Sequence, residues 1–335
     1  MRILIIGGTG NISRWFTQLF AERGDEIVLY NRGNKQLSLK GNIQYIYGDR
    51  TKYDLFAIQI NRAGHFDCVI DMVGFQEEEA VQAVKLFAGR TDQYIFCSTV
   101  DVYSKRPAFY PIHTQHAMGA SKSFVYGHRK MLMEEVFWKA HNELNFPLTV
   151  LRLAATYSEG WSPLVTCFGG ASYHLDRIKK GLPIILHGDG NGIWAATHSS
   201  DAAKVFINAA GNISCIGQVY NVSGDELLTW ETMHLIVAEL LKAPTPHFVY
   251  IPTTQLASLA PEQSEWCVEN FQYNNIFDNS PAKKDLGFEY TISYYEGARR
   301  CIRYLIENEG IEDCGNYPFY EGVLNKWNYA MKYLH

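Results

Sequence analysis

A glycine-rich turn near the N-terminus constrains the fold of this chain more than any other feature of its sequence. The segment Gly7-Gly8-Thr9-Gly10-Asn11-Ile12-Ser13 directly follows the apolar run from Arg2 to Ile6. After it, one helical stripe is formed by Ile12, Phe16, Leu19 and Phe20. A backbone without Cβ atoms can approach a phosphate closely, and the free N–H groups of a helix N-terminus stabilise its charge. The strand, turn and helix therefore predict a dinucleotide-binding turn.

Within this turn, we expect the cofactor pyrophosphate to contact Gly7, Thr9, Gly10, Asn11 and Ile12. The third glycine of the usual GxxGxxG pattern is replaced by Ser13. Serine is small enough to allow close packing between the helix and the strand, so the departure is tolerable.

Short apolar runs alternate with helix-period segments through the first half of the chain. Six of these runs are predicted strands: Arg2 to Ile6, Glu26 to Tyr30, Ile43 to Tyr47, Asp67 to Met72, Tyr94 to Ser98 and Thr149 to Leu153. This repetition predicts a Rossmann-type α/β fold with a doubly wound parallel sheet and helices on both faces.

The alternation ends near Tyr157, so we predict an NAD(P)-binding domain over residues 1–157. Residues 158–335 form a smaller mixed α/β region that mainly binds substrate, with some segments returning to the Rossmann sheet. Later strands are expected at Pro183 to Leu186, Gln218 to Val222 and Phe248 to Ile251, and helices near Asp201 to Ala209, Trp230 to Leu241 and Tyr294 to Glu307. The aromatic tail from Tyr317 to His335, which includes Tyr333, is expected to close a core or a subunit interface.

Composition argues against several classes of protein. The 30 basic and 35 acidic side chains give a net charge of −5, which disfavours nucleic acid as a partner. No apolar run reaches the roughly 18 residues needed to span a membrane. Seven cysteines without CxxC spacing favour a cytoplasmic, disulfide-free chain. His113 and His116 are close in sequence but lack a convincing third ligand, so no metal is expected.

The choice between NAD and NADP depends on the end of the second strand. Asn31-Arg32 stands where an NAD site usually has an acidic residue. Without that carboxylate a 2′-phosphate is not repelled, and Arg32 could pair with it or stack on adenine, so both cofactors remain open with a slight preference for NADP. Asp49 is a candidate acceptor for the adenine amino group, with a solvated turn as the alternative.

Catalytic chemistry is indicated by Tyr126 and Lys130, which are four residues apart and therefore share a helical face. An ammonium group beside a phenol is expected to lower the phenol pKa. Together with the glycine turn and Leu151-Arg152-Leu153-Ala154-Ala155-Thr156-Tyr157 in place of RPxxxYG, this pair resembles the extended short-chain dehydrogenase/reductases, the NAD-dependent epimerase/dehydratase family.

The resemblance implies roles for individual residues. Tyr126 would be the general acid/base, Lys130 would bind the nicotinamide ribose and lower the tyrosine pKa, and Thr99 would hydrogen-bond the substrate oxygen. Both Tyr126 and Lys130 would also touch the cofactor. Further cofactor contacts are expected at Arg50, Val73, Ser98 and Ala154. A homodimer through the helices around Tyr126 to Lys139 is also implied.

Substrate contacts are expected at Asp101, His128, Trp194 and His198. Dehydratases of the family continue after the threonine with Asp-Glu, whereas here Val100-Asp101 follows, which makes dehydration less favoured although Asp101 could still act as a base. Members that bind nucleotide diphosphates commonly carry an arginine where this chain has Trp194, whose indole would suit an uncharged sugar face or simple packing.

The predicted function is that of an NAD(P)-dependent sugar epimerase or oxidoreductase of carbohydrate metabolism, acting by hydride transfer at a carbinol or ketone carbon. A net NADPH-dependent ketone reductase and a sugar-nucleotide dehydratase are alternatives. A weaker resemblance to the chloroplast stem-loop-binding proteins, carried by Phe66 to Asp71, Tyr94 to Thr99 and Tyr220 to Gly224, leaves a non-enzymatic RNA-binding role as a further one. Those proteins generally lack the paired tyrosine and lysine that this chain keeps.

Overall fold

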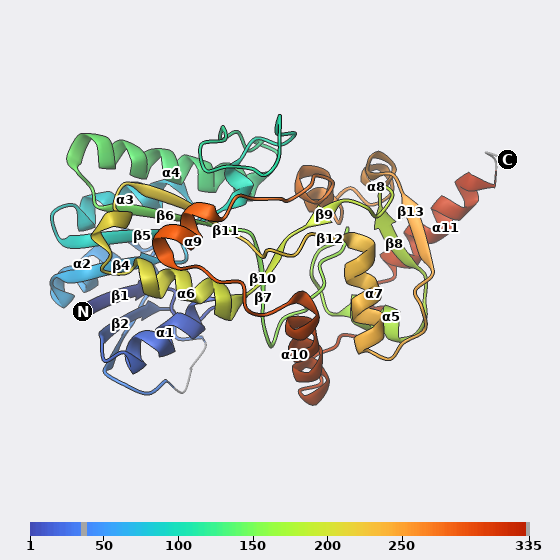
Figure 1. Cartoon of the computed structure of the whole chain (residues 1–335), viewed down its shortest axis with the longest axis horizontal. Helices are drawn as coiled ribbons and strands as arrows, with labels where there is room; N and C mark the ends of the chain where they lie inside the picture. The colour runs from blue at the N-terminus through green and yellow to red at the C-terminus, as the bar shows by residue number, and fades with distance from the viewer. Residues whose placement is uncertain (35–38, 333–335) are drawn as a thin grey trace. The chain divides into compact units, whose positions relative to one another are not determined.

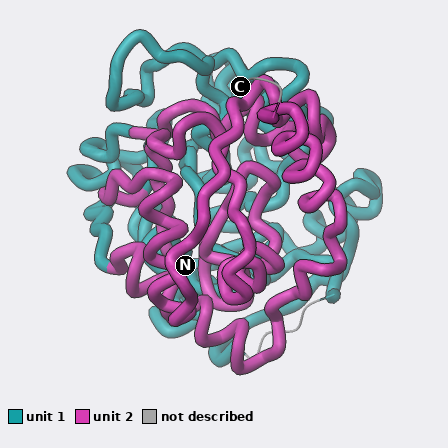
Figure 2. Tube along the Cα trace, turned by 90° about the vertical axis from the view of Figure 1, so that its right-hand side faces the viewer, with its two compact units in different colours: residues 1–156, 199–223, 277–291 teal, residues 157–198, 224–276, 292–335 magenta. Residues whose placement is uncertain are grey.

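The computed structural model describes residues 1–34 and 39–332, so Tyr333 of the aromatic tail lies outside the described residues. The chain divides into two compact units, each assembled from three segments (Figure 2). Unit 1 contains Met1–Thr156, Ser199–Ser223 and Phe277–Thr291. Unit 2 contains Tyr157–His198, Gly224–Ile276 and Ile292–His335.

Unit 1 is built on a seven-stranded sheet with the order β11-β6-β5-β4-β1-β2-β3, in which every neighbouring pair is parallel. The strands are β1 (Arg2–Ile6), β2 (Glu26–Asn31), β3 (Ile43–Tyr47), β4 (Phe66–Asp71), β5 (Thr91–Thr99), β6 (Leu148–Leu153) and β11 (Gln218–Val222). The predicted doubly wound parallel sheet is confirmed, and strand order reverses beside β1, where such sheets bind ligands.

Helices cover both faces of this sheet (Figure 1). One face packs against α1 (Ser13–Glu22), α6 (Ser199–Ala209) and α9 (Ser280–Leu286), and the other packs against α2 (Tyr53–Ala63), α3 (Glu77–Phe87) and α4 (Val125–Leu144). Each face has its own apolar core, with Phe16 and Phe206 in the first and Phe96 and Phe137 in the second.

The stripe predicted for α1 is partly wrong. Phe16 and Phe20 are buried, whereas Leu19 is 39% exposed. The buried face of α1 also includes Ser13 and Thr17, which centres it on the side of the helix away from Leu19.

Unit 2 contains two small pairs of strands. Parallel β8 (Ile184–His187) and β13 (Phe248–Ile251) form one pair, and antiparallel β9 (Ile193–Trp194) and β12 (Leu228–Thr229) form the other. The helices of this unit are α5 (Tyr173–Lys179), α7 (Trp230–Leu240), α8 (Thr253–Leu259), α10 (Tyr294–Glu307) and α11 (Phe319–Met331). Shorter elements of the chain are β7 (Ala155–Tyr157), β10 (Ala196–His198), η1 (Val100–Val102), η2 (Ile213–Cys215), η3 (Cys267–Phe271) and η4 (Cys314–Asn316).

The aromatic tail packs inside unit 2. Tyr317 stacks on Tyr173 with ring centroids 3.8 Å apart. Tyr320 is buried, and its hydroxyl oxygen accepts a hydrogen bond from the Ile185 amide of β8 at 2.7 Å. The first turns of α11 therefore belong to the core of this unit.

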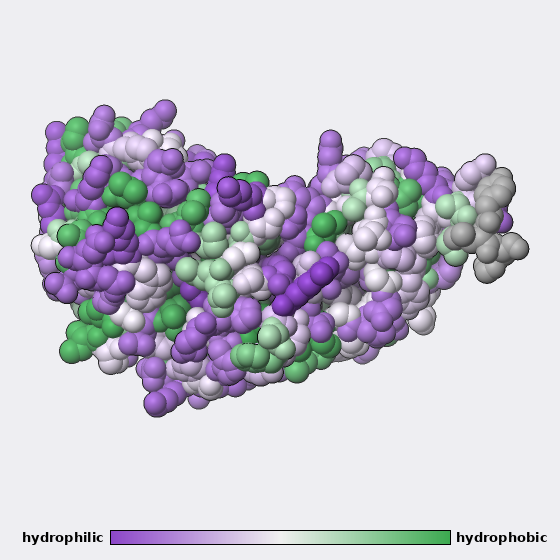
Figure 3. All heavy atoms as spheres, turned by 90° about the horizontal axis from the view of Figure 1, so that it is seen from above, coloured by the Kyte–Doolittle hydropathy of each residue, from purple (hydrophilic) through white to green (hydrophobic). Residues whose placement is uncertain are grey.

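The surface in Figure 3 is largely hydrophilic, with separated apolar patches. All seven cysteines are buried and none forms a disulfide. Among residues 1–34 and 39–332, no helix is both long enough and apolar enough to cross a membrane.

Candidate active and cofactor site

The glycine turn between β1 and α1 has no room for side chains. Gly7 has a φ of +89°, and a Cβ there would lie 2.4 Å from Val73 Cγ1. A Cβ on Gly8 would lie 2.5 Å from Leu29 Cδ2. The backbone conformation of Gly7 thus requires glycine, and a side chain at Gly8 would have to displace Leu29. The turn leaves its backbone bare at the N-terminus of α1, as a pyrophosphate site requires.

Ser13 explains the departure from the three-glycine pattern. Its hydroxyl donates to the Gly7 carbonyl at 2.7 Å and accepts from the Gly10 amide at 2.8 Å. Thr17 supports the same turn by donating to the Gly8 carbonyl at 3.0 Å. The serine therefore ties the two ends of the turn together.

The remaining residues of the glycine turn differ in their exposure to solvent. Thr9, Asn11 and Ile12 are partly buried, and Gly10 is exposed. The Asn11 side-chain amide donates to the Thr156 carbonyl at 3.2 Å. The turn is thereby connected to the chain that follows β6.

The adjacent ends of β2 and β3 carry the residues predicted for the adenosine side of the cofactor. The Asn31 side-chain oxygen accepts from the Gly33 amide at 2.9 Å, and Arg32 is exposed. Asp49 accepts from the amide and hydroxyl of Thr51, and these hydrogen bonds hold the pKa of Asp49 below its usual value. The positive charge of Arg32 also lowers the pKa of the Asp49 carboxyl, so these two side chains lie near each other.

Arg50 was predicted as a cofactor contact, and the structure places its guanidinium in a buried ion-pair network. Arg50 Nη1 lies 2.5 Å from Asp71 Oδ1, and Nε lies 3.7 Å from Glu79 Oε1. Tyr94 donates to the other Asp71 oxygen at 2.7 Å, and the Val73 amide donates to Oδ1 at 3.2 Å. Although burial raises it, the pKa of Asp71 is held low by Arg50 and Tyr94. The network fixes the loop that carries Val73 against Gly7.

Thr99, Asp101 and Tyr126 meet where β5 ends. The Thr99 hydroxyl donates to Asp101 Oδ2 at 3.1 Å, and the Asp101 amide donates back to Thr99 Oγ1 at 3.2 Å. Tyr126, near the start of α4, hydrogen-bonds Thr99. Burial and the Asp101 carboxylate raise the pKa of Tyr126, with a smaller opposing effect of the hydrogen bond to Thr99.

Lys130 is buried one turn along α4 from Tyr126, as its spacing predicted. Its ammonium donates to the Cys97 carbonyl at 2.8 Å and lies 4.9 Å and 4.8 Å from the ring centres of Phe75 and Phe96. Burial lowers the pKa of Lys130. The expected lowering of the Tyr126 pKa is wrong for this structure, because burial and Asp101 raise it while the ammonium is directed to the Cys97 carbonyl.

A second buried ion pair, which was not predicted from the sequence, lies one helical turn beyond Lys130 on α4. Glu134, fully buried on α4, accepts from Arg152 Nη2 at 2.7 Å and from the Ser98 hydroxyl. Arg152 also lies 4.7 Å from the Tyr103 ring centre. The four-residue spacing from Lys130 to Glu134 was the available signal, since it places both on one helical face. Ser98, predicted as a cofactor contact, thus takes part in this network.

The remaining candidates have separate surroundings. His128 is partly buried on α4 and its Nδ1 lies 3.2 Å from the Ala120 carbonyl oxygen. Ala154 is buried and its amide donates to the Val222 carbonyl at 2.9 Å. In unit 2, Trp194 packs against Trp230 and Phe271 with ring centroids 4.9 Å and 5.1 Å away, so the structure gives it a packing contact.

His198 of unit 2 is fully buried. Its Nε2 lies 3.4 Å from Glu159 Oε2, and its ring meets Tyr157 edge to face at 5.6 Å. The histidine is therefore held by a carboxylate and an aromatic ring within its own unit.

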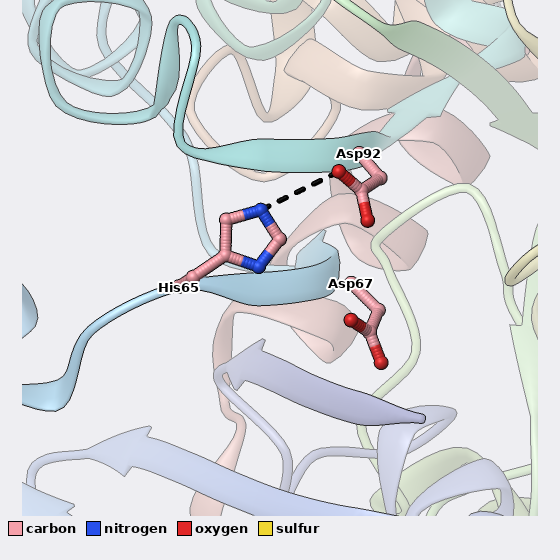
Figure 4. Close-up of side chains that lie close together, drawn as sticks. All are labelled: His65, Asp67 and Asp92. Atoms are coloured by element: carbon pink, nitrogen blue, oxygen red, sulfur yellow. Dashed lines mark ion pairs between the residues drawn. The ribbon is translucent and has the colours of Figure 1, made fainter.

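Two groups of potential metal ligands occur within the described ranges, and neither contains a predicted site residue. One is His65, Asp67 and Asp92, near the starts of β4 and β5 (Figure 4). There His65 Nε2 lies 3.4 Å from Asp92, and Asp67 accepts from the Arg2 amide at 2.7 Å. The other is Asp176, Asp313 and Cys314, where Lys180 pairs with both carboxylates. His113 instead lies 3.0 Å from Asp278.

Comparison with known proteins connects this geometry to a family. Residues 3–223 match the group described as the NAD dependent epimerase/dehydratase family. The chain belongs to that family. An NAD-type cofactor therefore fits the glycine turn described above.

Individual relatives show the range of the family. The chain is 27% identical over 263 residues to a chloroplast stem-loop binding protein of 41 kDa b from Arabidopsis thaliana. The aligned region covers 74% of this chain and 65% of that relative. It is 24% identical over 281 residues to 2′-dehydrokanamycin reductase of Streptomyces kanamyceticus, covering 83% and 77% of the two chains. It shares its fold with epimerase Mth375 of Methanothermobacter thermautotrophicus, with a TM-score of 0.74, 17% identity and coverage of 92% and 93%.

Proposed function

We propose that this protein transfers hydride between NAD(P) and a carbinol or ketone carbon of a sugar or sugar-derived compound. The observation that carries the proposal is the grouping of Thr99, Tyr126 and Lys130 around the end of β5. A contact chain joins this group to the cofactor turn, because Phe75 lies against Lys130 and Val73, two residues earlier, lies against Gly7.

The proposed roles follow from the chemistry of the side chains. When bound, NAD(P) supplies or accepts the hydride. Tyr126 gives a proton to the substrate oxygen during reduction and takes it back during oxidation. Lys130 holds the nicotinamide ribose with the N–H groups that the Cys97 carbonyl leaves available, since an ammonium has three. The Gly7 turn binds the pyrophosphate.

Net reduction and epimerisation share this chemistry and differ in whether the oxidised cofactor is released. The relative named 2′-dehydrokanamycin reductase supports net reduction of a sugar ketone, and the epimerase fold supports transient oxidation. Val100, in place of the acid found in dehydratases, makes elimination the least supported of the three reactions.

The test is incubation of the purified chain with NADPH or NADH and a panel of sugar ketones that includes 2′-dehydrokanamycin, and separately with oxidised NAD or NADP and a panel of sugars that carry the free hydroxyl. Loss of reduced-nicotinamide absorbance indicates net reduction, whereas a new isomer from a sugar without such a change indicates epimerisation. Tyr126→Phe should reduce either activity by roughly 10²- to 10⁴-fold. Tyr304→Phe, on the exposed side of α10, is the matched control. An unchanged rate in Tyr126→Phe would contradict the assignment.

RNA binding is a second candidate, supported by the likeness to the chloroplast stem-loop binding protein. The net charge of −5 opposes it. A gel-retardation assay with a stem-loop RNA at low salt separates the two candidates: salt-sensitive retardation supports RNA binding, and its absence at low salt removes this candidate.

We also propose a homodimer through α4. Met133 and Phe137 of this helix are buried in the core of unit 1, whereas Val125 and Leu144 are 45% and 61% exposed and available to a partner. Sedimentation of the intact chain tests this: a single species with the mass of one chain at micromolar concentration excludes the dimer.

A further inference from the structure

The hydrogen-bonding capacity of Thr99 is taken up by two neighbours. A hydroxyl has one hydrogen and two lone pairs. Its hydrogen goes to Asp101 Oδ2, since a carboxylate oxygen can only accept, and one lone pair receives the Asp101 amide. What remains is a single lone pair, which can accept a hydrogen bond but cannot donate one.

Tyr126 is the partner of that remaining lone pair. It hydrogen-bonds Thr99, so with the Thr99 hydrogen held by Asp101 the phenol must be the donor. If Tyr126 were ionised, Thr99 could hydrogen-bond its oxygen only by giving it the hydrogen that Asp101 now accepts. The carboxylate and the phenolate thus compete for one hydrogen.

We propose that Asp101 is a positioning residue that takes the only hydrogen of Thr99, so that Thr99 accepts from Tyr126 and the phenol is kept as a proton donor. Thr99 then orients Tyr126 and does not itself donate to the substrate oxygen, which differs from the role expected by resemblance. The catalytic meaning of this arrangement rests on the proposed function: it favours protonation of a substrate oxygen by Tyr126, as ketone reduction needs.

The charged and ionisable groups around this arrangement come from several elements. Asp101 on η1 and Cys97 on β5 both act to raise the pKa of Tyr126, after burial itself. Lys105 Nζ lies 3.8 Å from Asp101 Oδ1 and shares its charge. On α4, the Lys130 ammonium is bonded to the Cys97 carbonyl. Removing the Asp101 charge should therefore ease ionisation of Tyr126.

The experiment replaces Tyr126 with difluorotyrosine, whose phenol ionises at lower pH, and follows its titration by fluorine NMR without substrate or cofactor. Asp101→Leu, which removes the acceptor of the Thr99 hydrogen that an asparagine would keep, should lower the titration midpoint by roughly one to two pH units. The shift should persist when Thr99→Ser is added, because serine keeps the hydroxyl, and should shrink when Thr99→Val is added. Asp92→Leu is the control, since Asp92 is near the start of β5 while Thr99 ends it, about 23 Å away at the usual rise per residue.

Each result of the titration either supports the proposed role of Asp101 or overturns it. A midpoint in Asp101→Leu equal to that of Asp92→Leu overturns the proposal. An equal shift in the presence of Thr99→Val means that Asp101 acts through its charge alone, which overturns the part played by Thr99. If Asp101→Leu does not fold, the proposal predicts that Thr99→Val moves the midpoint whereas Thr99→Ser does not, and equal midpoints overturn it. Because no turnover is measured, the result does not depend on the proposed function.

Discussion

The interiors of the two units differ in what they bury. Unit 1 buries charges in pairs, Arg50 with Asp71 and Arg152 with Glu134. Among its described residues, unit 2 buries one charge, Arg177, but its partner Glu321 is exposed, and the other buried polar groups of this unit include neutral rings. His187 meets Trp230 at 4.8 Å, and His234 lies with its Nδ1 2.7 Å from the Trp230 carbonyl oxygen. Burial lowers the pKa of both histidines to about 4, so they are uncharged at neutral pH.

The difference shows where each unit depends on electrostatics. Buried ion pairs fix the geometry of the chain segments they join, and they are strongly destabilising when one partner is lost. In unit 1 both pairs are next to the proposed site. Asp71 accepts a hydrogen bond from the Val73 amide, and Glu134 is one helical turn from Lys130 on α4. Unit 2 depends on keeping its rings neutral, which makes it sensitive to acid.

The largest expected effect tests the charged interior. Arg50→Met removes the partner of Asp71 and should lower the free energy of unfolding by about 3–5 kcal/mol, measured by urea denaturation at pH 7. Arg299→Met, which breaks an exposed pair with Glu296, is the control and should change it by less than about 1 kcal/mol. Similar losses in the two variants would show that burial of the charge is unimportant.

The next effect tests the neutral interior. The unfolded chain protonates histidine near pH 6.5, whereas folded His187 and His234 resist protonation until about pH 4. Their contribution is complete above pH 6.5 and is lost as pH falls toward 4, by roughly 2 kcal/mol per histidine at pH 5. Urea denaturation at pH 7 and pH 5 measures it, and His234→Gln should reduce the loss. An equal loss in that variant would remove His234 as a cause.

A smaller effect is expected at Lys130. Phe75→Leu removes one of the two aromatic faces against the ammonium, which is worth about 0.5–1 kcal/mol at a partly exposed site. We expect the Kd for NADPH, measured by fluorescence titration, to rise a few-fold. Phe109→Leu, an exposed aromatic in contact with His113, is the control. Identical affinities in the two variants would show that Phe75 does not act on the cofactor site.

The smallest effect on stability is expected at exposed Arg32. Arg32→Ala should change the free energy of unfolding by less than about 0.5 kcal/mol. If Arg32 pairs with a 2′-phosphate, the same variant weakens NADPH binding relative to NADH several-fold. Arg62→Ala on α2 is the exposed control. A cofactor preference that does not change would assign Arg32 no part in it.

The strands could be predicted from sequence because parallel strands covered on both faces are almost continuously apolar. The predicted ends of β1, β3, β11 and β13 agree with the structure. The glycine turn was also readable, since both its strand and its helix are local in sequence.

The charge network could not be predicted in the same way. The partners of Arg50 are 21 and 29 residues away, and no local spacing connects them. For Tyr126 and Lys130, the spacing gave the shared helical face but not the direction of the ammonium. That direction depends on the Cys97 carbonyl, 33 residues earlier in the chain.

The hydroxyl of Ser13 has a kinetic consequence. Because it already joins the Gly7 carbonyl to the Gly10 amide, the turn holds its shape before any phosphate arrives. A preformed loop loses little conformational entropy on binding, so the encounter with a dinucleotide need not wait for the loop to become ordered. Association should then be a single-step process whose rate rises linearly with ligand concentration, without a plateau set by loop rearrangement.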